Sequence, residues 1–172
     1  MPYDPLTHRR RSIRLHGYDY AGSGVYFVTV VTKGREALFE DEALRLIVED
    51  SWRWLGSQYP RVSLDTFVLM PNHLHGILAL EDRHGRGGSR TAPTDHPKHL
   101  GRLIGAFKTV STKRINLTRA TPGALVWQRN YYERIIRDEE ELNRVRQYII
   151  DNPLHWEDDP ENPRQPSRSP AR

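Results

Sequence analysis

The sequence predicts an α+β fold of the ferredoxin-like type, in which a four-stranded antiparallel sheet is covered by helices. Segments with the periodicity of strands and helices follow one another in the order βαββαβ. A Pro71-Asn72 turn joins two of the strands directly, which indicates a hairpin. A further helical segment follows the last strand. We expect the second and fourth strands outside the third and first, with two helices on one face and an additional C-terminal helix.

The first half of the chain contains three strands and one helix of this pattern. Residues 25–32 are β-branched and aromatic throughout, as in a central strand that is buried on both faces. Residues 41–59 have apolar side chains at steps of three and four, with Asp41 as the N-cap and Pro60 ending the helix. The hairpin strands are expected at residues 62–70 and 73–80.

The second half begins with a Gly-, Pro- and charge-rich insertion at residues 81–98, which we expect to be flexible. A basic amphipathic helix follows, and then a short strand after a Thr-Pro-Gly turn. Asp138 with Glu141 three residues later indicates the start of the third helix, which runs to about Asn152. The expected ranges are 99–118 for the basic helix, 124–128 for the strand, 1–24 for a basic N-terminal arm, 25–157 for the folded domain and 158–172 for a disordered tail.

Composition limits the classes of protein that the chain can represent. Its 172 residues suggest one domain with tails, and there is no apolar run long enough to cross a membrane. The absence of cysteine excludes disulfides, zinc–thiolate sites and a cysteine nucleophile. The N-terminus has no secretory-type apolar segment, so we expect a cytoplasmic protein. A net charge of +4, carried mostly by arginine, is compatible with a nucleic-acid partner without requiring one.

Two histidines lie on the strand that follows the Pro71-Asn72 turn. Side chains alternate along a strand, so His73 and His75 point to the same side of the sheet. Two neighbouring imidazoles on a rigid strand can bind a divalent metal. The alternative is that both histidines simply line a half-buried sheet, because a His-x-His motif alone is weak evidence.

The third helix carries a tyrosine and an asparagine one turn apart, Tyr148 and Asn152. Both flank an apolar stripe that should pack on the sheet, so Tyr148 could also be an ordinary core tyrosine with a bonded hydroxyl. Together with the histidines, they supply the parts of a metal-assisted tyrosine nucleophile. Mg²⁺ or Mn²⁺ held by His73, His75 and the Asn152 carbonyl would orient a phosphate for attack by the Tyr148 hydroxyl.

Basic side chains that could contact DNA phosphates occur in three places. The arm, the basic helix and the segment after the expected fourth strand each contain some. An arm in solvent and an ordinary amphipathic helix are the alternatives. The candidates are Arg9, Arg10, Arg11, Arg14, Lys108, Arg129 and Arg134.

Three motifs in this order resemble those of one known family. They are the strand Pro71–Ile77, the segment Val126–Arg137 and the helix end Tyr148–Pro153. The chain resembles single-tyrosine HUH transposases of the IS200/IS605 type over roughly residues 10–157, and most of all their REP-associated tyrosine transposase relatives.

The resemblance implies a metal-dependent enzyme that cuts single-stranded DNA and forms a 5′-phosphotyrosine. The REP-associated members recognise DNA hairpins. His73 and His75 match the metal histidines and Tyr148 the nucleophile, whereas Asn152 stands where relatives have a polar third ligand, often glutamine. Tyr131 and Tyr132 are rival nucleophiles that precede the helix. Insertion-sequence relatives act as dimers, whereas REP-associated members can act as monomers, so a monomer or a homodimer is expected.

Two other functions remain open at this point. A ferredoxin-like sheet also serves non-catalytic nucleic-acid-binding modules, which stack bases on sheet aromatics. Here these aromatics would be Tyr26, Phe27 and Phe67, and the histidines would have no role. A small metal hydrolase with another substrate is the second alternative, but it leaves the basic charge unexplained.

Overall fold

The computed structural model describes residues 24–81, 100–159 and 161–162. Within them, four strands form one antiparallel sheet in the order β2-β3-β1-β4. The strands are β1 (Gly24–Val31), β2 (Val62–Leu69), β3 (His73–Leu80) and β4 (Tyr132–Ile136). The predicted α+β fold and the predicted strand order are therefore confirmed.

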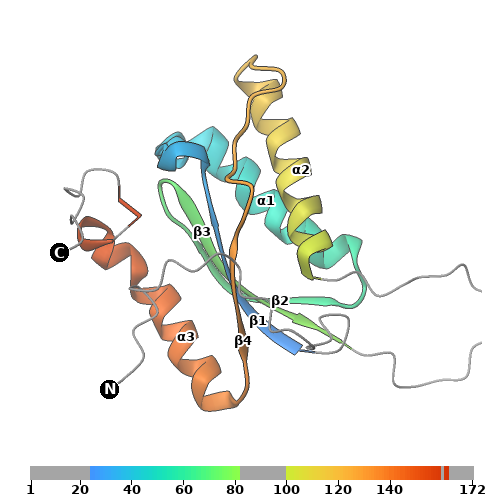
Figure 1. Ribbon diagram of the computed structural model, residues 1–172, viewed down its shortest axis with the longest axis vertical. Helices are drawn as coiled ribbons and strands as arrows, with labels where there is room; N and C mark the ends of the chain where they lie inside the picture. The colour runs from blue at the N-terminus through green and yellow to red at the C-terminus, as the bar shows by residue number, and fades with distance from the viewer. Residues whose placement is uncertain (1–23, 82–99, 160, 163–172) are drawn as a thin grey trace, which may run out of the picture.

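Three α-helices cover the two faces of this sheet. Helices α1 (Glu42–Gln58) and α2 (Leu100–Thr118) lie side by side on one face, and α3 (Glu139–Asp151) lies on the other (Figure 1). The N-caps are those expected, because the Asp41 carboxylate accepts the amides of Ala43 and Leu44, and Asp138 accepts the amide of Glu141. Short 3₁₀ helices occur at Lys33–Arg35, Leu38–Glu40 and Asn152–Asp158.

The predicted fourth strand at residues 124–128 is wrong. Only Trp127 of that segment pairs with the sheet, through one isolated bridge to Thr32. Val126 and Trp127 are buried for another reason, since they fill the core beneath α1 and α2, whereas Leu125 is exposed. The real strand, β4, runs along β1 at the edge of the sheet. Edge strands tolerate charged residues, which explains why this strand has no clear apolar pattern.

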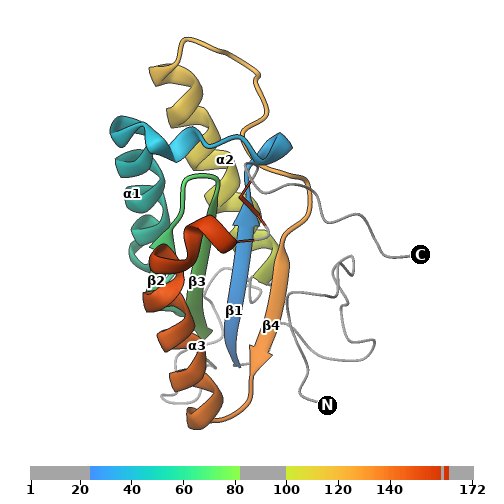
Figure 2. The same cartoon turned by 90° about the vertical axis from the view of Figure 1, so that its left-hand side faces the viewer.

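The alternation of side chains produces two separate cores. Leu74 and Leu78 of β3 belong to the larger core under α1 and α2, whereas Ile77 belongs to a smaller core that also contains Phe27 and Ile149. His73 and His75 share the parity of Ile77, so they face α3. Figure 2 shows α3 crossing this face of the sheet. The histidines consequently lie between the sheet and the helix that carries Tyr148.

Gly76 directly follows His75 in the sequence and faces the opposite core. A Cβ atom at this position would lie 2.6 Å from the Trp52 ring, which is itself completely buried. The indole cannot withdraw into solvent, so a side chain here displaces either the strand or the helix α1.

Replacing Gly76 by alanine is expected to destabilise the protein by about 1–3 kcal/mol through overpacking. Urea unfolding followed by circular dichroism measures the change. Gly105→Ala is the matched control, because no atom lies within 4 Å of a Cβ there and the residue is inside α2. That substitution should stabilise by about 0.5–1 kcal/mol. Equal effects of the two substitutions would contradict the Trp52 contact as the cause.

Several sequence expectations fall on residues that the structure does not describe. The basic arm up to residue 23, most of the insertion and residues 163–172 lie outside the described ranges. None of the helices in the described part is sufficiently long and apolar to cross a bilayer.

Candidate metal and tyrosine centre

His73 and His75 converge on one point at the start of β3. Their Nε2 atoms lie 3.0 Å apart, and both side chains are buried. The Met70 amide donates to the His73 carbonyl across the tight turn, which fixes where the strand begins. The same-side arrangement predicted from the His-x-His spacing is therefore present.

Each imidazole is held through its other nitrogen. His73 Nδ1 lies 2.8 Å from Asn72 Oδ1, and His75 Nδ1 lies 2.8 Å from Thr29 Oγ1. The Asn72 amide nitrogen donates to two backbone carbonyls, so its oxygen faces His73 as an acceptor. His73 consequently donates from Nδ1 and presents the lone pair of Nε2. Neither Asn72 nor Thr29 was selected from the sequence, although Asn72 directly precedes the motif.

Burial keeps both rings neutral. Desolvation lowers the pKa of His73 to about 3. The pKa of His75 is also lowered well below its ordinary value, by desolvation and by the neighbouring His73. Neutral imidazoles are the form that ligates metals. The two Nε2 atoms lie 3.0 Å apart, so both could give a lone pair to one cation.

Tyr148 lies above this pair, as predicted. Its hydroxyl is 3.4 Å from His75 Nε2, and its ring packs edge-on against Phe27. Burial raises the pKa of Tyr148 to about 12, with a further increase from the negative charge of Asp159 and a decrease from a hydrogen bond with Asn152. The phenol is therefore protonated at neutral pH, and the side chain remains 37% exposed to solvent. It can be reached by a large substrate.

Asn152 lies one turn beyond Tyr148 and is buried. Among the described residues, its Oδ1 atom has no hydrogen-bond partner although solvent does not reach it. An unpaired buried carbonyl oxygen is costly, and a hard cation is one group that would satisfy it. An orphaned oxygen one helical turn from Tyr148, together with the two converging imidazoles, fits a divalent metal.

A carboxylate that the sequence analysis missed completes the donor set. Asp159 Oδ2 lies 3.7 Å from His73 Nε2, and one ligand atom each of His73, His75 and Asp159 all fall within 4.8 Å of one another. Asp159 is buried, and this burial raises its pKa. Imidazole nitrogens together with a carboxylate oxygen form a donor set that could hold a metal ion.

Asp159 comes from a segment expected to belong to a disordered tail. The 3₁₀ helix Asn152–Asp158 turns the chain back toward β3, and Arg35 forms a 2.7 Å ion pair with Glu161. The Asn72 side chain also donates to the Glu161 carbonyl. The described residues Asp159, Glu161 and Asn162, which lie past the boundary expected at residue 157, thus make contacts with the folded domain or with one another. The Pro- and Asp-rich composition gave no indication of this, because these contacts are long-range.

Three of the predicted DNA-contact residues lie in the described part of the chain, and they differ in whether other groups of the protein already bind them. Lys108 donates its ammonium protons to the carbonyls of Gln128 and Asn130 at 2.9 and 3.0 Å, and to that of Arg129 at 3.3 Å. Burial lowers the pKa of Lys108 to about 8. Arg134 forms an ion pair with Glu141. Arg129 is exposed. The four arginines of the arm lie outside the described residues.

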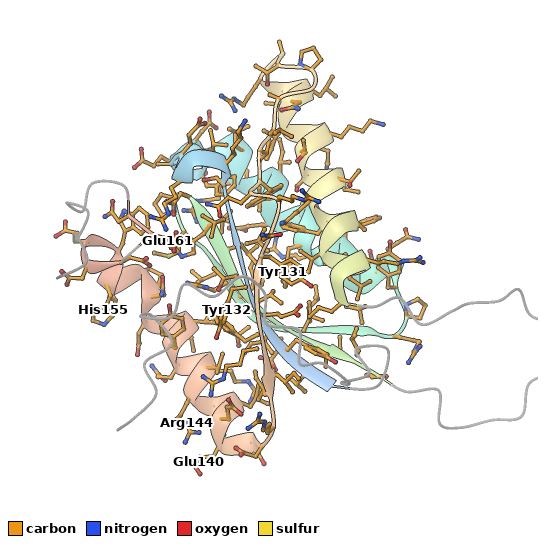
Figure 3. All side chains as sticks on the ribbon, viewed as in Figure 1. Tyr131, Tyr132, Glu140, Arg144, His155 and Glu161 are labelled. Carbon is orange, nitrogen blue, oxygen red and sulfur yellow. The ribbon has the colours of Figure 1, made fainter. Side chains whose placement is uncertain are left out.

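The rival tyrosines point to different sides of the sheet. Tyr131 packs against the core under α1 and α2, with the Lys108 ammonium 5.5 Å from its ring centre. Tyr132 contacts Phe27 on the histidine side. Figure 3 labels both and shows their separate directions. Tyr148 is the tyrosine with a hydroxyl beside His75.

Among the described residues, two ion pairs attach helix α3 to the sheet, in addition to the contact between Tyr148 and His75. Arg134 of β4 pairs with Glu141, whose carboxylate also accepts the Arg137 amide. In the middle of the helix, Arg146 pairs with Asp65 of β2 through two contacts of 3.0 and 2.5 Å. The hydrogen bond from Arg146 is the main cause that lowers the pKa of Asp65 to about 2.

This shift leads to an expected pH dependence of stability. The folded-state pKa of Asp65 lies below its unfolded value, so the stabilisation is complete above about pH 4 and is lost as the pH falls toward 2. Because the pair is partly exposed, we expect a loss of only about 1 kcal/mol. Urea unfolding of the wild type and of Asp65→Asn between pH 5 and pH 2 measures it. The two curves should converge at low pH, and a constant difference would contradict this origin.

Comparisons with known proteins place these features in a family. No family model matches the chain. An uncharacterised protein of Haemophilus influenzae is 36% identical over 173 residues, covering 91% of this chain and 95% of that protein. A second protein of Haemophilus influenzae, named as a candidate REP-associated tyrosine transposase, is 22% identical over 138 residues and covers 79% and 73% of the two chains.

One solved structure has the same fold. It is a REP-associated tyrosine transposase bound to a REP hairpin, with a TM-score of 0.57 and 19% sequence identity. The match covers 76% of this chain and 67% of that one. At this identity the likeness establishes the fold, in agreement with the sheet order and helix placement described above.

The sheet, the paired histidines and the tyrosine helix define a transposase-like α+β protein. The chain belongs to the same family as the 36% identical protein of Haemophilus influenzae. The resemblance predicted from the three motifs is also confirmed, and the chain is a relative of the REP-associated tyrosine transposases.

Proposed function

We propose that this protein is a metal-dependent endonuclease and strand transferase of single-stranded DNA, acting as a transposase through a 5′-phosphotyrosine intermediate. One observation carries the proposal. The Tyr148 hydroxyl lies 3.4 Å from His75 Nε2, and that nitrogen is paired with His73 Nε2 at 3.0 Å. A nucleophile placed beside a metal-type donor pair is the arrangement that this chemistry needs.

The chain offers four donors for Mg²⁺ or Mn²⁺. They are Nε2 of His73, Nε2 of His75, Oδ1 of Asn152 and the Asp159 carboxylate. When bound, the ion would polarise the scissile phosphate and offset the charge that develops during attack. Thr29 and Asn72 hold the two imidazoles in the orientation that directs these nitrogens at one point.

Tyr148 supplies the group that makes the covalent bond. The phenol loses its proton, and its oxygen attacks the phosphorus. The bond from phosphorus to the 3′ oxygen breaks, and that oxygen takes up a proton to become a free 3′-hydroxyl. The strand downstream of the cut remains attached to Tyr148 through its 5′-phosphate, as a phosphotyrosine. A second strand's 3′-hydroxyl can reverse the step and reseal the DNA. Packing of the ring on Phe27 and His75 orients the phenol for attack.

The substrate we propose is hairpin DNA with a single-stranded flank. The solved structure of the related REP-associated tyrosine transposase holds a REP hairpin. The net charge of +4 and the exposed Arg129 support contact with phosphates in this chain as well. We propose that the arginines of the N-terminal arm add further contacts, and that the protein works as a monomer or a homodimer.

The rival interpretation as a base-stacking module has less support. Such modules need aromatic side chains on an open face of the sheet. Tyr26 and Phe27 are both buried, one under each layer of helices, and α3 covers the face that would otherwise be free. Phe67 packs against Trp52 in the larger core.

A search for covalent adducts tests the proposed function. The full-length protein is incubated with Mn²⁺ and a labelled library of hairpin-bearing single strands, and products are separated by denaturing electrophoresis. We expect a DNA-linked protein band that disappears with EDTA, and sequencing of its DNA identifies the cleavage site. Metal-independent binding without an adduct on any strand would count against the enzyme and for a binding module.

A further inference from the structure

We propose that Asp65 and Arg146 form a positioning pair, which fixes the rotation of α3 about its own axis and so holds the Tyr148 hydroxyl over His75. The inference rests on the proposed function, because it assigns these residues to the placement of the nucleophile. Neither residue contacts the histidines. They act through the helix that Tyr148 shares with Arg146.

The pair has the geometry of a directional contact. Arg146 Nε donates to Asp65 Oδ1 at 3.0 Å, and Arg146 Nη2 donates to Asp65 Oδ2 at 2.5 Å. Two parallel bonds between a guanidinium and a carboxylate define an angle as well as a distance. Arg146 Nη1 is also bonded to Asn143 Oδ1 on the preceding turn, which keeps the guanidinium in place.

Asp65 is held firmly enough to act as an anchor. It lies at an irregularity of β2, since Leu64 pairs with Leu78 while Phe67 already pairs with Gly76. Asp65 and Thr66 therefore share one opposing residue, as in a β-bulge, which re-aims side chains. The Thr66 amide and hydroxyl both donate to Asp65 Oδ1, at 2.6 and 2.9 Å. The bonds from Thr66 thus hold the Asp65 carboxylate in place independently of Arg146.

Arg146 and Tyr148 lie on opposite flanks of the helix face that packs on the sheet. Successive residues are about 100° apart around a helix axis, so Arg146 and Tyr148, two residues apart, are separated by roughly 200°. The apolar stripe between them contains Val145 and Ile149. Apolar packing is non-directional and by itself leaves rotation weakly defined. The ion pair on one flank therefore sets the position of the tyrosine on the other.

A small rotation would be sufficient to disturb the site. A group about 6 Å from a helix axis moves about 2 Å when the helix turns by 20°. The hydroxyl of Tyr148 is already 3.4 Å from His75 Nε2, so such a shift would remove the contact. The second attachment of α3, between Arg134 and Glu141, lies near the start of the helix and two turns from Tyr148. Of the two ion pairs between α3 and the sheet, the pair of Arg146 and Asp65 is therefore the one near Tyr148.

The same helix provides a matched control. Arg144 forms an ion pair with Glu140 on the solvent side of α3, with side chains 62% and 83% exposed. Figure 3 labels this pair, which points away from the sheet. Like the pair of Arg146 and Asp65, it is an ion pair between an arginine and a carboxylate, but it joins two residues of one helix. Arg144→Gln removes it without detaching α3 from β2.

The experiment compares Asp65→Asn, Arg146→Lys and Arg144→Gln with the wild type. The first readout is the single-turnover rate of adduct formation at saturating hairpin DNA and Mn²⁺, with the DNA Kd measured separately. The second is the ¹⁹F NMR spectrum of the protein with 3-fluorotyrosine at position 148, which does not depend on activity. Circular dichroism confirms that each variant is folded, and Arg146→Lys serves as the second test if Asp65→Asn does not fold.

We expect Asp65→Asn to slow adduct formation at least tenfold while the DNA Kd stays within twofold. Arg146→Lys keeps the charge but not the two-bond geometry, so it should retain an intermediate rate. The ¹⁹F signal should shift or split in both, and Arg144→Gln should match the wild type in every readout. The inference is overturned if Asp65→Asn and Arg144→Gln behave alike in rate and in ¹⁹F signal.

The two readouts separate this inference from the proposed function. If the wild type forms no adduct, the proposed function fails, and the ¹⁹F spectra still decide whether the pair positions Tyr148. A changed signal in Asp65→Asn with an unchanged signal in Arg144→Gln then supports the positioning role alone. Unchanged signals in both would overturn it.

Discussion

Replacement of Tyr148 by phenylalanine is expected to reduce covalent adduct formation below detection, while the affinity for hairpin DNA stays within about twofold. The change removes one oxygen atom, the one that would form the phosphotyrosine bond. The ring remains and keeps its contacts with Phe27 and His75. Denaturing electrophoresis with labelled hairpin DNA and Mn²⁺ measures the adduct, and fluorescence anisotropy measures binding.

Tyr132→Phe is the matched control, because Tyr132 also faces the histidine side and contacts Phe27. It should leave most of the adduct in place. Stability should change little in Tyr148→Phe, since the lost hydroxyl has only a long contact to His75 at 3.4 Å and a bond with Asn152. An adduct that persists in Tyr148→Phe and disappears in Tyr132→Phe would transfer the nucleophile role to Tyr132.

The half of the site on β3 could be predicted because it depends on local geometry. Alternation along a strand is sufficient to place His73 and His75 together, and the Pro71-Asn72 turn marks where the strand begins. The helix period similarly places Tyr148 and Asn152 on one flank of α3. That the two halves meet follows from the ferredoxin-like order of elements with a third helix on the uncovered face.

Other parts depended on contacts between distant segments and could not be predicted in this way. Asp159 reaches His73 because Asn72 and Arg35 hold the Glu161 region against the turn before β3. The periodicity of apolar residues along the sequence does not predict such a contact between distant segments. The fourth strand was misplaced for a related reason, since a buried apolar segment around Trp127 resembles a strand more closely than the charged edge strand does.

The internal roles of Lys108 and Arg134 illustrate the same limit for charged residues. Both were selected as DNA contacts from composition. In the fold, Lys108 binds the carbonyls that precede β4, and Arg134 binds Glu141 at the start of α3. A basic side chain in a basic protein has no sequence feature that distinguishes a phosphate contact from an internal one. Only the arrangement of the neighbouring carbonyls and carboxylates makes the difference.

The second large effect is expected at the donor pair, where His75→Gln should weaken Mn²⁺ binding by about two orders of magnitude or more. Loss of groups that merely orient a ligand already costs about 10- to 100-fold in metal affinity, and His75 would contact the metal itself. Glutamine is close in size to histidine, so the buried position stays filled and the Thr29 hydroxyl keeps a polar neighbour. Isothermal titration with Mn²⁺ in the absence of DNA measures the affinity.

The same titration assigns the oxygen donors. Asp159→Asn keeps the shape of the side chain but removes its charge, and it should weaken Mn²⁺ binding about tenfold, because its carboxylate lies within 4.8 Å of both imidazole nitrogens. Asn152→Ala removes the orphaned Oδ1 atom and should weaken binding severalfold. Arg144→Gln on the solvent side of α3 should have no effect. If Asn152→Ala alone lowered the affinity, Asp159 would only cover the site, and Asn152 would be the third ligand that the helix period predicts.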